Sequence, residues 1–239
     1  MDRYYKSGEI INDYSIIEKI GEGRYGIIYL AINEKNEKSI VKQLKSDMLK
    51  VTKRTLFYEE KLLNDLSELN DSRFPKFISK FKDEDRQGYI LEYIQGIVFE
   101  DLLLDGYEFS KQEIYQVAIK LLNLVKTLHN KNIVHRDIRL PNIIIKENNE
   151  LALIDFGLAR NIDENHEKEI DYWYIGDFLL HLYYSSYIAT DSNEKPWYEE
   201  LDLIPEEKTF LKKLMGIEES YKNTEEIKKQ LIKIMNLIN

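Results

Sequence analysis

Cysteine is absent from the 239-residue sequence, so the chain forms no disulfide, no thiolate nucleophile and no cysteine-ligated zinc site. Glycine and proline are scarce, with 10 and 4 residues, and no stretch rich in Gly, Ser or Pro marks a flexible linker. No uncharged apolar run approaches the ~20 residues that cross a bilayer. The first residues also lack the apolar core of a signal peptide. We therefore expect a cytoplasmic protein that does not act at a membrane.

Apolar residues make up 43% of the chain, enough for a substantial core in one or two domains. The 43 acidic residues outnumber the 34 basic ones, and the net charge is −9. This balance does not indicate a broadly basic surface, so we expect no nucleic acid partner. The four histidines also lack the spacing of a metal-binding pair on one helix face.

The period of the apolar pattern changes along the chain. From Tyr14 to about Tyr93 the sequence consists mostly of β-branched and aromatic runs broken by turn residues, with a helical insert over roughly Thr52 to Leu69. After Ser110 the pattern becomes mainly helical. We therefore predict an α+β fold with a small β-rich lobe followed by a larger helical lobe.

The helical parts carry clear boundary signals. Ser110 and Glu113 form a capping-box pattern at the start of one helix. The segment Asp171 to Ile188 is apolar on nearly every face, which is typical of a buried central helix. Two amphipathic helices are predicted to close the chain, over Glu206 to Met215 and Thr224 to Ile238.

Gly21, Gly23 and Gly26 fit the pattern G-x-G-x-x-G. A strand sequence follows, whereas a dinucleotide-binding fold requires a helix there. A glycine loop between two strands can instead bring its backbone over a triphosphate. The alternative is a glycine-rich hairpin turn without a ligand.

Lys42 lies in the next strand sequence, on the same side as Ile40 because side chains alternate along a strand. An inward lysine is costly unless it meets an anion. Glu59 of the helical insert lies on the face of its leucines and is the natural partner, whereas Glu60 is turned about 100° away. The alternative is a solvated strand lysine.

The most specific stretch is His135-Arg136-Asp137, with Asn142 five residues after the aspartate and Asp155-Phe156-Gly157 thereafter. H-R-D-x-x-x-x-N followed by D-F-G resembles the protein kinase family. The resemblance extends from Tyr14 to the last helices. It implies one kinase-like domain over residues 1–239, with the N-lobe about 1–93, the hinge about 92–96 and the C-lobe about 97–239.

The resemblance also implies a role for each matching residue. Lys42 would pair with the α/β-phosphates of ATP and with Glu59. Asp137 would accept the proton of the attacking hydroxyl, and Asn142 and Asp155 would hold Mg²⁺. The remaining nucleotide contacts would come from Gly21, Gly23, Gly26, Ile28, the gatekeeper Leu91 and the hinge backbone from Glu92 to Ile94. Asp171, in a D-x-W-x-x-G pattern, would brace the catalytic loop.

Two features depart from the family. Arg139 stands where a lysine is usual, and an arginine can also neutralise the γ-phosphate. Only thirteen residues, 158–170, separate D-F-G from Asp171, without an A-P-E motif and without Ser, Thr or Tyr. We hypothesise that one carboxylate of this segment (Asp163, Glu164, Glu167 or Glu169) pairs with Arg136 in place of a phosphate. The alternative is a solvated acidic loop.

The function implied is an ATP- and Mg²⁺-dependent phosphotransferase that acts on a hydroxyl, with Ser/Thr of a protein as the expected acceptor. Two alternatives stay open at this point: a nucleotide-binding pseudokinase or scaffold, and a kinase of small molecules. The resemblance names neither the protein substrate nor the oligomeric state.

Overall fold

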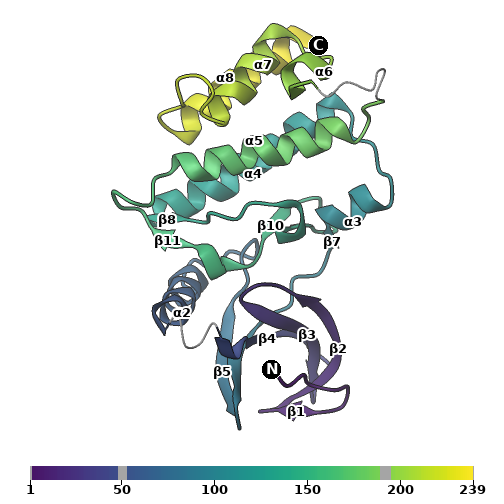
Figure 1. Cartoon of the computed structure of the whole chain (residues 1–239), viewed down its shortest axis with the longest axis vertical. Helices are drawn as coiled ribbons and strands as arrows, with labels where there is room; N and C mark the ends of the chain where they lie inside the picture. Colours follow the sequence, from purple (N-terminus) through teal and green to yellow (C-terminus); the bar gives the residue numbers. More distant parts are fainter. Residues whose placement is uncertain (1, 48–52, 189–194, 239) are drawn as a thin grey trace. The chain divides into compact units, whose positions relative to one another are not determined.

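A computed structural model describes residues 2–47, 53–188 and 195–238; the side chains of 53–59 and 238 lie outside this description. The chain forms two compact units, Met1–Gln95 and Gly96–Asn239 (Figure 1). The first unit is β-rich and the second is mainly helical. This confirms the predicted α+β class.

The N-terminal unit is built on one antiparallel sheet of six strands with the order β1-β2-β3-β4-β6-β5. The helix α2 follows β4 in sequence, as predicted from the leucine spacing. The strands and the helix are β1 (Ile10–Ile11), β2 (Tyr14–Glu22), β3 (Gly26–Asn33), β4 (Lys38–Leu44), α2 (Lys53–Ser67), β5 (Phe77–Asp83) and β6 (Arg86–Glu92).

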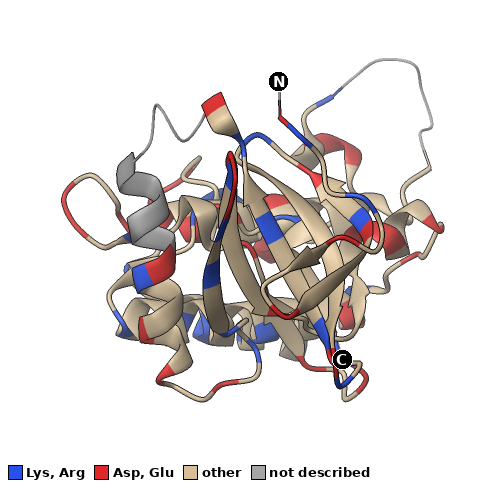
Figure 2. Ribbon diagram, turned by 90° about the horizontal axis from the view of Figure 1, so that it is seen from below, with Lys and Arg blue, Asp and Glu red and all other residues tan. Residues whose placement is uncertain are grey.

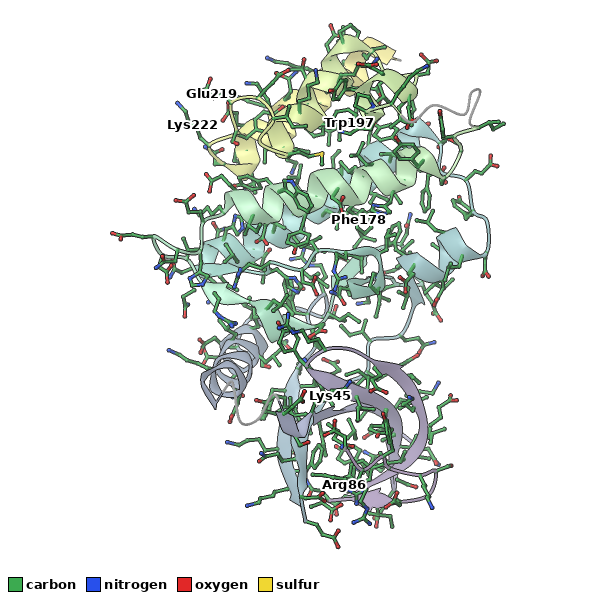
Figure 3. All side chains as sticks on the ribbon, in the orientation of Figure 1. Lys45, Arg86, Phe178, Trp197, Glu219 and Lys222 are labelled. Atoms are coloured by element: carbon green, nitrogen blue, oxygen red, sulfur yellow. The ribbon has the colours of Figure 1, made fainter. Side chains whose placement is uncertain are left out.

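The two faces of this sheet carry different residues. One face forms a core cluster that includes Tyr29, Val41 and Ile90. The N-terminal segment lies against this curved sheet (Figure 1). Its Tyr5 belongs to the core cluster, and the centroid of its ring lies 3.5 Å from the guanidinium carbon of the buried Arg86, which is labelled in Figure 3. The residues between these core positions along each strand point to the opposite face.

The C-terminal unit combines helices with short strands. Its helices are α3 (Phe99–Leu104), α4 (Lys111–Asn130), α5 (Glu169–Tyr184), α6 (Trp197–Glu200), α7 (Pro205–Leu214) and α8 (Thr224–Ile238). Its strands are β7 (Ile97–Val98), β8 (Ile133–Val134), β9 (Ile143–Ile145), β10 (Leu151–Leu153) and β11 (Arg160–Asn161), with 3-10 turns η1 (Leu140–Asn142) and η2 (Phe156–Leu158). They pair antiparallel in two small sheets, β10-β9-β7 and β11-β8.

Helices α4 and α5 run side by side through this unit (Figure 1). The predicted capping box is present, because the Ser110 hydroxyl accepts from the Glu113 N–H and the Glu113 carboxylate accepts from the Ser110 N–H. On α5, the ring of Phe178 is buried and meets Phe99 edge-on with centroids 5.0 Å apart (Figure 3). The apolar segment is therefore the central helix that its sequence predicts.

Five turns are closed by asparagines with a left-handed backbone: Asn12, Asn36, Asn70, Asn132 and Asn149, with φ between 49° and 62°. These asparagines adopt the left-handed backbone conformation that glycine adopts at such turns in many proteins. Basic and acidic residues are interspersed along the ribbon seen in Figure 2. In the described parts of the chain, no helix combines the length and low charge that a bilayer crossing requires.

Candidate active site

The glycine loop forms the turn between β2 and β3, where the Gly23 N–H donates to the Gly26 carbonyl at 2.9 Å. A Cβ at Gly26 would lie 2.8 Å from the backbone oxygen of Gln43, so strand packing itself requires this glycine. Gly23 has no atom within 4 Å of such a Cβ, and Gly21 has only ordinary contacts with Ile28. The last glycine is therefore structural, whereas the first two leave the backbone open to a ligand.

Glu22 fixes one side of this loop. Its carboxylate pairs with Lys45 at 2.8 Å and with Lys19 at 3.1 Å, and it accepts a hydrogen bond from the Tyr4 hydroxyl at 3.2 Å. The hydrogen bonds from Lys45, Lys19 and Tyr4 lower the pKa of Glu22 to about 2. The Lys45 N–H also donates to the Tyr25 carbonyl at 3.2 Å. This cluster was not predicted from the sequence.

Lys42 is buried in β4, only 4% exposed, and forms one cross-strand row with Ile28 and Tyr89. This row lies on the sheet face opposite the core cluster of Val41. The predicted partner Glu59 lies in α2, but its side chain is outside the described residues. Its neighbour Glu60 pairs with Lys80 of β5 at 2.9 Å.

The predicted adenine contacts lie at the end of β6. Leu91 pairs with Ile40, on the same sheet face as Lys42. Glu92 closes the strand: its N–H donates to the Lys76 carbonyl at 2.9 Å and its carboxylate accepts from the Lys76 N–H at 3.1 Å. Ile94 follows as a buried residue, 8% exposed.

Asp137 is held in a tight loop before η1. Its buried carboxylate accepts two hydrogen bonds from the guanidinium of Arg139, with Nη2 at 3.0 Å from Oδ2. The Asn142 amide donates to both the backbone oxygen and Oδ2 of Asp137, each at 2.9 Å. The bond to Asp137 raises the pKa of Arg139 above its usual range. These three predicted residues are therefore brought together in one cluster.

The loop around Asp137 is braced by Asp171 at the start of α5. This fully buried carboxylate accepts hydrogen bonds from the backbone N–H groups of His135 at 3.0 Å and Arg136 at 2.8 Å. It also forms a hydrogen bond with Nε2 of His129 at 2.9 Å. Arg136 has a left-handed backbone with φ 66°, which the paired N–H helps to hold. The predicted bracing role of Asp171 is confirmed.

Asp155 precedes η2 and also has a left-handed backbone, with φ 60°. Its Oδ1 accepts from the Gly157 N–H at 3.2 Å, and its side chain is exposed. Phe156 turns the other way and meets His135 edge-on, with centroids 4.8 Å apart. This turn holds the carboxylate outward and the ring in the core.

The donor set suits Mg²⁺. The amide nitrogen of Asn142 is used by Asp137, which leaves its carbonyl oxygen, and Asp155 adds carboxylate oxygen. Within the described residues, no group of three or more His, Asp or Glu side chains could hold a metal on its own. Mg²⁺ commonly takes one or two protein ligands and completes its shell with phosphates and water. These residues therefore fit a metal carried by a nucleotide.

The hypothesis that an acidic residue of the short segment pairs with Arg136 is wrong. The Arg136 Nη1 donates to the Leu158 carbonyl at 3.4 Å, and no carboxylate of the described segment forms an ion pair with it. Asp163 instead closes a local turn with His166 Nδ1 at 2.8 Å and the Asn165 N–H at 2.8 Å. Asp163 is therefore satisfied by local partners rather than by Arg136.

Glu207 of α7 is a further buried carboxylate, and it was not predicted from the sequence. It is 1% exposed and accepts from Lys111 Nζ at 3.1 Å, from the hydroxyls of Tyr115 and Tyr183, and from the Ile204 N–H at 2.8 Å. Burial is the main cause that raises the pKa of both tyrosines, and the nearby Glu207 carboxylate raises it further. Glu207 thus ties α4, α5 and α7 together.

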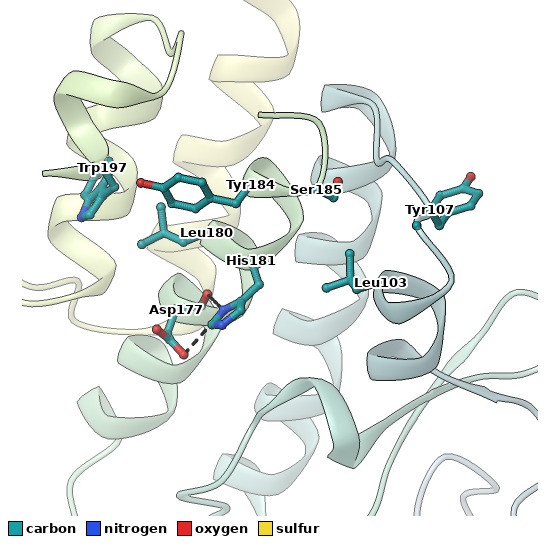
Figure 4. Close-up of a pocket in the computed structure, with 9 residues that line it drawn as sticks. Leu103, Tyr107, Asp177, Leu180, His181, Tyr184, Ser185 and Trp197 are labelled. Atoms are coloured by element: carbon teal, nitrogen blue, oxygen red, sulfur yellow. Dashed lines mark hydrogen bonds and ion pairs between the residues drawn. The ribbon is translucent and has the colours of Figure 1, made fainter. Parts of the chain in front are cut away.

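A cavity of about 550 Å³ lies elsewhere in the C-terminal unit and is shown in Figure 4. Its wall includes Leu103, Tyr184 and Trp197, with His181 hydrogen bonded through Nδ1 to the Asp177 carbonyl at 2.9 Å. None of the predicted site residues lines it.

Comparison with known proteins agrees with this geometry. The protein kinase domain model matches residues 14–176. The probable serine/threonine-protein kinase YbdM of Bacillus subtilis is 34% identical over 239 residues, which cover 96% of this chain and 93% of that protein. Serine/threonine-protein kinase D of Synechocystis sp. is 28% identical over 162 residues, 64% of this chain and 31% of that protein.

Human cyclin-dependent kinase-like 2 is 29% identical over 173 residues, 70% of this chain and 34% of that protein. The crystal structure of the kinase domain of PknI from Mycobacterium tuberculosis superposes with a TM-score of 0.76 over 98% of this chain and all of that one. Its sequence identity is 13%, so this match supports the fold alone. The family model and the Bacillus relative together show that this chain belongs to the protein kinase family and is a protein kinase-like phosphotransferase.

Proposed function

We propose that this protein transfers the γ-phosphate of ATP to a serine or threonine hydroxyl of a protein. The observation that carries the proposal is the cluster of Asp137, Arg139 and Asn142 in the braced loop. Phosphoryl transfer needs an oriented hydroxyl and charge stabilisation more than covalent help, and this cluster offers both. The names of the Bacillus and Synechocystis relatives support Ser/Thr as the acceptor.

The residues act in separate roles. Asp137 orients the hydroxyl and accepts its proton as the oxygen attacks phosphorus. Arg139 neutralises phosphate charge, which requires its guanidinium to move from Asp137 to the nucleotide. Lys42 and the backbone at Gly21, Gly23 and Gly26 bind the phosphates. Asn142 and Asp155 would hold Mg²⁺, which supplies positive charge to the β/γ-oxygens.

We further propose that the units Met1–Gln95 and Gly96–Asn239 work as one kinase-like domain, with residues 92–96 as the hinge. Ile28, Leu91 and the backbone from Glu92 to Ile94 would contact adenine. Glu59 would position Lys42. The cross-strand row of Ile28 and Lys42, and Leu91 on the same sheet face, support this assignment.

Asp137→Asn tests the base. This isosteric change removes the proton acceptor and keeps the volume, so we expect phosphate transfer to fall by at least about 10³-fold. Binding of Mg-ATP should stay within a few fold. The assay is transfer of labelled phosphate to a protein mixture, followed by phosphoamino-acid analysis. Transfer at the wild-type rate, or label only on tyrosine, would contradict the proposal.

Arg139 offers a matched comparison. Arg139→Lys keeps the positive charge and should retain most transfer, whereas Arg139→Met should lower kcat because nothing then neutralises the γ-phosphate. Both substitutions release Asp137 from its bidentate partner. Equal rates for the two variants would show that the charge at this position takes no part in the reaction.

A further inference from the structure

A groove of about 540 Å³ opens beside the catalytic loop, entirely within the C-terminal unit. The short segment after D-F-G and the start of α5 form one wall, and the end of α7 forms the other. Its lining includes the apolar residues Ile170, Trp173 and Met215, which we call its floor, and the acidic residues Glu164, Glu167 and Glu169, which we call its rim. We call it the acidic groove.

Two apolar residues of the groove are more exposed than most of their helix, α5. Most of α5 is buried, yet Ile170 and Trp173 near its start are 37% and 39% exposed. Behind them α5 packs closely against the end of α7, because a Cβ at Gly176 would lie 2.7 Å from the Cγ of Met215 and 3.2 Å from the Cβ of Leu214. Exposed large apolar side chains on a rigid support are the common anchors of protein–protein contacts.

The rim of the groove carries negative charge. Glu164, Glu167 and Glu169 are exposed, and no ion pair involves them in the described parts of the chain. Asp163, by contrast, is used by His166 and the Asn165 N–H. The single guanidinium of the groove belongs to Arg136, which donates to the Leu158 carbonyl. Three unpaired carboxylates against one cation favour a basic ligand.

The groove adjoins the reacting centre. Arg136 in its wall directly precedes Asp137, and Trp173 in its floor precedes Tyr174. Asp171, between Ile170 and Trp173, accepts the Arg136 N–H at 2.8 Å, so the start of α5 is joined directly to the catalytic loop. A polypeptide that presents its hydroxyl to Asp137 therefore has the acidic groove within reach of its next residues.

We propose that the acidic groove docks the protein substrate through Lys or Arg residues and an apolar side chain that flank the phosphorylated hydroxyl. This inference rests on the proposed function and adds the class of substrate: a basic segment with an apolar anchor. The short segment after D-F-G thus serves as a docking wall, since its carboxylates are not used to hold Arg136.

The test uses a fluorescein-labelled peptide with a central serine flanked by arginines and leucine, and a second peptide with glutamines for the arginines. Binding to the nucleotide-free protein is followed by anisotropy. We expect the triple variant Glu164→Gln, Glu167→Gln, Glu169→Gln to bind the basic peptide roughly tenfold more weakly, and with a smaller dependence on salt. Trp173→Ala should lower affinity for both peptides.

The control variant carries Glu108→Gln, Glu199→Gln and Asp202→Asn, three exposed carboxylates outside the groove. It has the same change in net charge and should bind like wild type. Thermal melts establish that each variant is folded, and the glutamine variants alter only exposed groups. With Mg-ATP, the groove variant should show a raised KM for the peptide and an unchanged rate of ATP hydrolysis without peptide.

Equal affinity of wild type and the groove variant for the basic peptide would overturn the docking inference. So would preference for the glutamine peptide, or a dimer that Trp173→Ala disperses, because a second copy would then be the occupant. Groove-dependent peptide binding without any phosphate transfer would refute the proposed function instead and leave the docking inference standing.

Discussion

At the scale of single residues, the charge next to the glycine loop is as informative as the glycines. Glu22 lies between Gly21 and Gly23 and joins the loop to Lys45, Lys19 and the N-terminal Tyr4. Such a loop gains from being held in one conformation, because ordering it on nucleotide binding costs entropy. We therefore expect Glu22 to act through the loop backbone as a positioning residue.

Glu22→Gln should raise KM for ATP several-fold and leave kcat within about twofold, because uniform binding is lost while the chemical groups stay in place. Steady-state kinetics at saturating substrate measures both constants. The control is Glu18→Gln on the same strand, for which the described structure has no ion pair. A fall in kcat with unchanged KM would contradict this role.

His135 gives a prediction for pH. Burial lowers its pKa below the ordinary 6.5, so the folded protein keeps it neutral while the unfolded chain takes up a proton. Stability should therefore decline as the pH falls below about 6.5, by up to about 1.4 kcal/mol per pH unit. Urea unfolding at pH 7.5 and 5.5 measures the slope, which His135→Phe should reduce. An unaltered slope in this variant would show that other groups cause the loss.

At the scale of elements, helix contacts in the C-terminal unit depend on one buried charge. Glu207→Ala would remove the acceptor of two buried tyrosine hydroxyls and one of the two acceptors of the Lys111 ammonium, which also donates to the Asp202 carbonyl. We expect a loss of about 2–4 kcal/mol in the free energy of unfolding, mainly because two buried hydroxyls lose this acceptor. Tyr183→Phe removes only one contact and should cost about 1 kcal/mol. Urea denaturation compares them, and equal stabilities would refute the role of Glu207.

Elements with strong local signals were predictable from the sequence. The capping box at Ser110 and the apolar segment of α5 gave correct helices, because caps and periodicity act locally. Helix α3 was not predicted, since six residues show less than two turns of pattern. Glu207 and Glu22 were missed because their partners are distant in sequence or paired across a loop, which no periodicity encodes.

The site shows the same division. The residues around Asp137 follow a fixed spacing, and their mutual bonds could be expected from it. The partner of Arg136 could not be predicted, because charge favours a carboxylate, whereas the folded loop brings the Leu158 carbonyl to the guanidinium and gives Asp163 a local partner in His166. Local geometry, rather than charge alone, made that hypothesis fail.

At the scale of the whole molecule, a ligand that binds only the folded chain stabilises it. Mg-ATP at 100 times its Kd should add about 2.7 kcal/mol to the free energy of unfolding. For a chain of this length, that corresponds to a rise in Tm of roughly 5–10 °C. The double variant Asn142→Ala, Asp155→Ala should lose the part of this shift that EDTA also removes. An identical shift with and without Mg²⁺ would contradict the assignment of these two ligands.

The asparagine turns have a consequence for the unfolded chain. A glycine samples more backbone conformations than any other residue and loses more freedom when it folds. At Asn12, Asn36, Asn70, Asn132 and Asn149 the chain accepts left-handed strain in the native state and starts from a less disordered ensemble. Because the chain has little glycine, its unfolded state samples fewer backbone conformations before any tertiary contact forms.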